Sequence, residues 1–183
     1  METFLQWFQE GSTVAIVVTV WLFLYTVAIA WIYLYRYFFL RGWIAKERDT
    51  AQRLLAGDDK LSVGCALYPC AKSGAHPSLL HACLSSAQKE ATAGLAPLSA
   101  IASTSPFVGL FGTVVGVLQA FAGFTDGVTL SIVAPAISEA LVVTAMGIVV
   151  AIPAYWAHLL LKRKAYELTS YIQIQIDLIS SRA

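Results

Sequence analysis

Three long stretches without a charged residue constrain this sequence most. They cover residues 11–35, 91–125 and 140–161, with His158 counted as neutral. Each exceeds the roughly 20 apolar residues that an α-helix needs to cross the hydrocarbon core of a bilayer. Backbone polar groups in hydrocarbon must be hydrogen-bonded within their own segment, so these stretches predict helices. We therefore expect an all-α membrane protein with three transmembrane helices.

The composition agrees with this class, because 58% of the residues are hydrophobic and only 13% are charged. The first stretch is too long for the apolar region of a signal peptide, and no small-residue cleavage site follows it, so we expect it to be retained. A net charge of +1 gives no reason to expect a nucleic-acid partner.

The positions of the basic residues predict the topology. All 12 Lys and Arg lie within residues 36–89 and 162–182. By the positive-inside rule these segments are cytoplasmic, which puts the N-terminus outside and the C-terminus in the cytoplasm. The expected segments are an outer interfacial helix (1–12), a first transmembrane helix (13–40), a cytoplasmic helical segment (41–90), a second transmembrane helix with a cytoplasmic extension (91–125), an outer turn (126–133), a third transmembrane helix (134–161) and a cytoplasmic helical tail (162–183).

The sequence supports three further expectations, about the first span, the second span and the tail. Trp and Tyr crowd the first span, so we expect this helix to face lipid on the outside of its assembly. We also expect the helix at 78–92 to continue straight into the second span. The tail carries an apolar stripe at helical spacing that needs a partner, and it consists of Leu168, Ile172, Ile176 and Ile179. The partner is either the helix expected at 43–56 or the same tail in another subunit.

Small residues form one stripe on each of the second and third spans. Lipid tails are as apolar as leucine, so such stripes are where membrane helices pack closely. We assign helix packing to Gly109, Gly112, Gly116, Gly147 and Ala151. Each stripe also carries one threonine near mid-membrane, which favours two facing stripes that line an interface or a path.

The candidate polar site consists of Thr113, Thr144 and Glu139. Glu139 is the one acidic residue deep in an apolar run, where a charge is costly, so we expect it to face water or the bundle interior. The alternative is a structural carboxyl group at an outer helix end. The threonine hydroxyls can hold water or a hydrated proton but do not titrate, and the alternative for them is a bond to their own helix. Glu139 and Thr144 lie about 140° apart around a helix, so their roles are separate.

We expect no enzymatic activity, since the sequence has no nucleophile–base pair, metal-ligand set or phosphate-binding loop. Cysteines and histidines cluster in the cytoplasmic segment without matching a zinc template. We therefore expect no metal and no cofactor, and reduced, packed cysteines. The cluster consists of Cys65, Cys70, His76, His81 and Cys83.

Two motifs resemble the MotA/TolQ/ExbB proton channel family, on its ExbB and TolQ side. They are IASTSPFVGLFGTVVG at 101–116 and VAPAISEALVVTAMG at 133–147, followed by Ala151-Ile-Pro153. The resemblance implies a multi-pass protein of the bacterial inner membrane. It also implies a pentamer around two copies of a single-span partner like ExbD or TolR, in contact with membrane lipid.

The resemblance further implies a motor driven by the proton-motive force, with protons as the transported ion, that energises a TonB-like or TolA-like protein acting on the outer membrane. Thr113 and Thr144 then correspond to the family's polar pair beside the partner's aspartate, and Glu139 to its acidic residue near the outer pore. The loop at 41–89 is shorter than in the usual ExbB or TolQ. The alternative function is a non-conducting membrane scaffold subunit.

Overall fold

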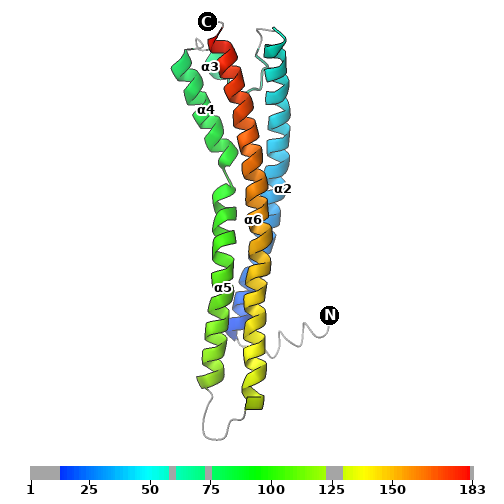
Figure 1. The fold of residues 1–183 in the computed structure, drawn as a ribbon, viewed down its shortest axis with the longest axis vertical. Coiled ribbons are helices and arrows are strands. Elements are labelled where there is room, and N and C mark those ends of the chain that lie inside the picture. The colour runs from blue at the N-terminus through cyan, green and yellow to red at the C-terminus, as the bar shows by residue number, and fades with distance from the viewer. Residues whose placement is uncertain (1–12, 58–60, 73–75, 123–129, 182–183) are drawn as a thin grey trace. The chain divides into compact units, whose positions relative to one another are not determined.

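The computed structural model describes residues 13–57, 61–72, 76–122 and 130–181, in which the secondary structure is helical and contains no strand (Figure 1). Three helical stretches, within 13–55, 77–122 and 134–180, are long and apolar enough to cross a membrane. The prediction of an all-α protein with three membrane-spanning helices is confirmed. The interfacial helix expected at 1–12 lies outside the described residues. The helices are α2 (Thr13–Leu55), α3 (Tyr68–Lys72), α4 (Pro77–Thr92), α5 (Leu95–Ala122) and α6 (Leu130–Ser180).

The chain divides into two compact units. The first, which we call the span unit, comprises residues 1–31 and 97–157. The second, which we call the extension unit, comprises residues 32–96 and 158–183. Because α2 and α6 are long, each contributes one part of its length to each unit.

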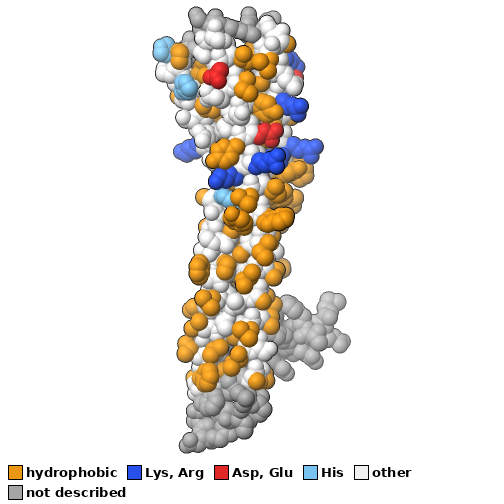
Figure 2. Space-filling view, in the orientation of Figure 1, with side chains coloured by type: hydrophobic (Ala, Val, Ile, Leu, Met, Phe, Trp, Pro, Cys, Tyr) orange, Lys and Arg blue, Asp and Glu red, His pale blue; other side chains and the backbone are white. Residues whose placement is uncertain are grey.

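The span unit buries small side chains and exposes large apolar ones. Ala140, Ala151 and Ala154 are buried, whereas Phe23 and Phe107 are 67% and 70% exposed. Figure 2 shows hydrophobic side chains spread over much of the visible face of this part of the chain. In water so much exposed apolar surface would drive association, but in lipid it is the expected outer surface of a helix bundle.

The extension unit has an ordinary aliphatic core built from α2, α4, α6 and the segment that precedes α3. Leu168, Ile172 and Ile176 of α6 are buried, as the stripe in the tail predicted, whereas Ile179 at its end is half-buried. Their partner within the chain is the part of α2 that carries Glu47, since Gln175 donates one hydrogen bond to the Glu47 backbone carbonyl (3.0 Å) and one to its side chain (2.8 Å). Of the two alternatives for the stripe, the structure supports the helix at 43–56.

Glu47 is the centre of a buried polar cluster in this unit. Its side chain is fully buried. The carboxylate accepts hydrogen bonds from the Ala66 backbone N–H (2.7 Å), from Trp43 Nε1 (3.1 Å) and from Gln175 Nε2. A buried carboxylate is tolerated when donors surround it, so this cluster fixes α2, α6 and the segment before α3 to one another.

The expected continuous helix from 78 into the second span is wrong, because α4 ends at Thr92 and α5 begins at Leu95. Gly94 has a φ of +85°, in the left-handed region where glycine is favoured. Arg36 donates from its guanidinium group to the carbonyls of Glu90 (2.6 Å) and Ala91 (2.9 Å) in the last turn of α4, where the Glu90 carbonyl also accepts from the Ala93 N–H (3.2 Å). The break is therefore stabilised by a side chain from α2.

The expectation of reduced cysteines is wrong for two of the three. Cys70 of α3 and Cys83 of α4 form a disulfide, and their Cα atoms lie 6.5 Å apart. This distance is within the usual range for a disulfide, and it arises because α3 packs on α4. Cys65 is free and buried. Among the described residues, no group of three or more His, Cys, Asp or Glu is placed to hold a metal ion.

Candidate functional site: a hydroxyl pair and a carboxyl group in the span unit

The small stripes of α5 and α6 face each other, and glycine makes this approach possible. A Cβ added to Gly147 would lie 2.7 Å from the Ser105 carbonyl oxygen and 3.0 Å from the Gly109 Cα. A Cβ added to Gly109 would lie 3.0 Å from the Thr144 Cα. Real Cβ atoms essentially never come within 3.0 Å of such neighbours, so a larger residue at Gly147 would force the two helices apart. At Gly109 the contact is tighter than most real Cβ contacts, so a larger residue there would require the α6 backbone to shift by a few tenths of an ångström.

Gly112, Gly116 and Ala151 also lie on the packed faces. A Cβ added to Gly116 would meet the Ala140 Cβ at 2.9 Å, and one added to Gly112 would meet a methyl group of Val143 at 2.7 Å. Ala151 is 9% exposed and lines a groove with residues of α5. The structure thus places all five of the small residues selected from the sequence within the α5–α6 contact of a single chain.

Thr113 and Thr144 meet at this close approach. Their hydroxyl groups are hydrogen-bonded to each other. Thr144 Oγ1 also lies 3.0 Å from the Gly109 carbonyl oxygen of the opposite helix, and Thr113 Oγ1 lies 3.3 Å from both the Gly109 and the Ala140 carbonyl oxygens. Each hydroxyl has one proton and several acceptors in reach, so the pair can change donor and acceptor roles by rotation about the side-chain bond. The alternative of a threonine bonded only to its own helix applies to neither residue.

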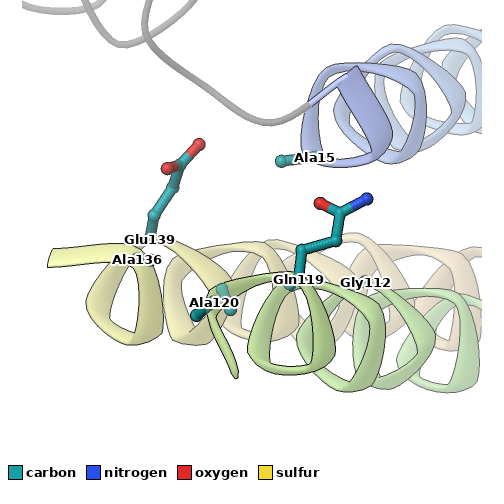
Figure 3. Close-up of a pocket in the computed structure, with 8 residues that line it drawn as sticks. Ala15, Gly112, Gln119, Ala120, Ala136 and Glu139 are labelled. Carbon is teal, nitrogen blue, oxygen red and sulfur yellow. The ribbon is translucent and has the colours of Figure 1, made fainter. Parts of the chain in front are cut away.

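Glu139 extends into a separate cavity of about 290 Å³ in the same unit. Figure 3 shows its carboxyl group and the Gln119 amide extending from α6 and α5 toward the side on which Ala15 of α2 lies. The Oε1 atom of Glu139 is buried and has no hydrogen-bond partner among the described residues. A carboxyl oxygen in this state can accept a hydrogen bond from water.

Glu139 and the threonine pair are distinct sites, as the angular argument predicted. The five residues from Glu139 to Thr144 correspond to about 7.5 Å along a helix. In the described part of the span unit, Glu139 is the only Asp, Glu, Lys, Arg or His. The level of the threonine pair therefore offers hydrogen-bonding groups but no group that takes up a proton.

Sequence reasoning missed Gln119 and Ser105. Gln119 lines the cavity of Glu139, and it follows Gly112 and Gly116 at steps of four and three, so the helical spacing was a usable signal. Ser105 is fully buried, and its hydroxyl donates to the Ile101 carbonyl at 2.6 Å. The hydroxyl therefore bonds within its own helix, at the position where the Ser105 carbonyl faces Gly147 of α6. No local sequence pattern indicated the contact between Ser105 and Gly147.

These features define a multi-pass helical membrane protein whose tightly packed spans hold, among the described residues, one carboxyl group and a hydroxyl pair. The sequence profile of the MotA/TolQ/ExbB proton channel family matches residues 66–174, more than half of the chain. The chain belongs to this family, which is of the transport and channel type. It is accordingly a transport-energising, proton-channel-like subunit of the bacterial inner membrane.

Individual relatives agree with this assignment. The chain is 36% identical over 194 aligned positions to the biopolymer transport protein ExbB-like 1 of Helicobacter pylori, covering 100% of this chain and 99% of that protein. It is 52% identical over 65 residues to ExbB of Pseudomonas putida, covering 34% of this chain and 20% of that protein. It is 46% identical over 77 residues to TolQ of Pseudomonas aeruginosa, covering 41% of this chain and 33% of that protein.

Proposed function

We propose that the chain is the ExbB/TolQ-like stator subunit of a motor driven by the proton-motive force. In this proposal it assembles as a pentamer around a dimer of a single-span ExbD-like or TolR-like partner. The assembly then energises a TonB-like or TolA-like protein. The observation that supports it best is the hydroxyl pair at the α5–α6 contact, at a level of the span unit where the described residues include no titratable acid or base.

A proton crossing the membrane needs a group that binds and releases it. Thr113 and Thr144 can donate and accept hydrogen bonds but cannot carry the charge. The missing carboxyl group is therefore supplied by a partner helix, and the two hydroxyls stabilise one of its protonation states. Glu139 has a buried oxygen without a partner among the described residues, and it provides a hydrogen-bond acceptor toward one end of the path.

The orientation belongs to the same proposal. The basic residues of the described chain all lie in the extension unit, and none lies in the span unit. Since Lys and Arg are retained on the cytoplasmic side, the extension unit is cytoplasmic. The N-terminus and the α5–α6 connection then lie on the outer side, and Glu139 lies in the outer half of the third span.

The competing function is a non-conducting scaffold, and one observation favours it. Gly109 and Gly147 pack against the facing helix of the same chain, and the Thr113 and Thr144 hydroxyls are hydrogen-bonded to each other. A scaffold needs nothing more from these residues. It does not explain why the buried Oε1 atom of Glu139 has no partner among the described residues, because such a group costs stability unless it is used.

Proton flux in liposomes separates the two functions. We expect flux only when the ExbD-like or TolR-like partner is present. Thr113→Val and Thr144→Val should each lower it at least about tenfold, because a hydrogen bond to a charged group is worth about 1.5–3 kcal/mol and 1.4 kcal/mol is a factor of ten. Thr19→Val is the matched control, since Thr19 is also buried in the span unit but bonds only to the Ala15 carbonyl of its own helix (2.8 Å). Glu139→Gln tests the carboxyl group with little change in shape.

Substantial flux from this chain alone would refute the two-component mechanism. Unchanged partner-dependent flux in both threonine variants would show that the hydroxyls are only structural. If no variant and no partner produces flux above that of empty liposomes, the scaffold function is correct.

A further inference from the structure

The disulfide between Cys70 and Cys83 joins α4 to α3, a short element that has few other constraints. α3 has five residues, and none of them is buried. Isolated helices this short are not stable in water, so α3 depends on what surrounds it. The segment before it is held by the buried Leu67 and by the Ala66 N–H bond to Glu47, but these contacts end where α3 begins. The covalent bond to α4 is therefore a principal constraint on α3.

The two bonded cysteines differ from the third in accessibility. Cys70 and Cys83 are half-buried, so small thiols and disulfides can reach the bond. Cys65 is only 4% exposed. Its burial, and then the negative charge of Glu47, raise the pKa of its thiol, which keeps it in the unreactive protonated form at neutral pH. Cys65 therefore does not compete for the partner of either bonded cysteine.

Disulfides in the cytosol are uncommon, and those that form there are usually transient or redox-sensing. We propose that Cys70 and Cys83 form a reversible redox switch that locks α3 onto α4 in the extension unit. The proposal rests on the cytoplasmic orientation given above, but it does not depend on proton conduction. It can therefore fail or succeed independently of the proposed motor.

The chemistry is thiol–disulfide exchange with a low-molecular-weight disulfide as the oxidant. The thiolate of one cysteine attacks that disulfide, forms a mixed disulfide and releases one small thiol. The second cysteine then attacks the mixed disulfide, closes the Cys70–Cys83 bond and releases the second small thiol. The two protons of the protein thiols end on the two released thiols, and reduction by two small thiols reverses both steps.

A redox titration of the full-length protein in inner-membrane vesicles opened to the buffer tests the switch. The vesicles are equilibrated with glutathione and glutathione disulfide at graded ratios, then alkylated and analysed by peptide mass spectrometry. We expect Cys70 and Cys83 to change together from disulfide to two alkylated thiols within this series, while Cys65 stays protected until denaturation. Cys65→Ser should give the same curve, and Cys70→Ser should leave Cys83 as a thiol or a mixed disulfide throughout.

Hydrogen exchange measures the structural consequence. Reduction should speed amide exchange in residues 68–72 by about tenfold, because α3 loses its covalent constraint. Exchange in residues 105–116 of α5 should not change and serves as the internal control. A pair that stays reduced in excess glutathione disulfide would overturn the proposal. So would a pair that stays oxidised at the most reducing ratio, or exchange in α3 that does not respond to reduction.

Discussion

The substitution Glu47→Ala removes the acceptor at the centre of the extension unit. The carboxylate is fully buried and receives three hydrogen bonds from three different parts of the chain. Alanine leaves the Ala66 N–H and one N–H of Gln175 without an acceptor. Trp43 is half-buried, so its N–H can turn toward solvent and is not counted.

The magnitude follows from these two donors. Each buried donor left unsatisfied costs about 1–3 kcal/mol, which gives a loss of about 2–6 kcal/mol in the free energy of local unfolding. At the lower bound this raises the open population about 30-fold, because 1.4 kcal/mol is a factor of ten. Removing the charge also lowers the pKa of the Cys65 thiol toward its ordinary value, which adds to the effect.

The assay uses Cys65 as the reporter. With Cys70 and Cys83 in their disulfide, it is the one free thiol of the chain's three cysteines. The rate at which a maleimide labels the detergent-solubilised protein then measures opening of the extension unit. We expect Glu47→Ala to be labelled about 30-fold faster than the parent chain, or more.

The matched control is Asp49→Ala. Asp49 lies on the same helix and carries the same charge, but it is exposed and pairs only with Arg53 one turn away (2.9 Å). Exposed pairs of this kind contribute about 0.5 kcal/mol or less, so the labelling rate should change about twofold. If Glu47→Ala is labelled no faster than Asp49→Ala, the carboxylate is not a buried acceptor and the reasoning is refuted.

Two further predictions concern packing and pH. Gly147→Ala should lower the unfolding temperature in detergent, because the added Cβ meets backbone atoms and costs about 1–3 kcal/mol of stability or more. Gly42→Ala is the control and should not lower it, because nothing lies within 4 Å of its added Cβ. Equal unfolding temperatures for the two variants would argue against the close α5–α6 contact. Because the folded protein raises the pKa of Cys65 above its ordinary value of about 9, stability should be fully present below that pH and fall as the pH rises through the folded pKa. Chemical unfolding measured between pH 8 and pH 10 should show this fall for the parent chain, and a fall of the same size in Cys65→Ala would contradict it.

Much of the span unit could be predicted from the sequence. A helix in lipid must be long, apolar and free of charge, and those requirements are met locally, residue by residue. The spacing of Gly109, Thr113 and Gly116 predicts one face, because i, i+3 and i+4 positions share a side of any helix. The tail stripe was predictable for the same reason.

The tertiary structure alone decided which faces meet and at what level. Thr113 pairs with Thr144 and Gln175 with Glu47 because of the axial shift and rotation of one helix against another, and those are set by packing over the whole contact. Residues 128 positions apart in the chain carry no local signal of such a pairing. The helix break at Gly94 and the Cys70–Cys83 bond also depend on a neighbouring helix. The first is stabilised by Arg36 of α2, and the second requires α3 to pack on α4. Local periodicity thus determined the spans and their faces, and packing between distant segments determined the site.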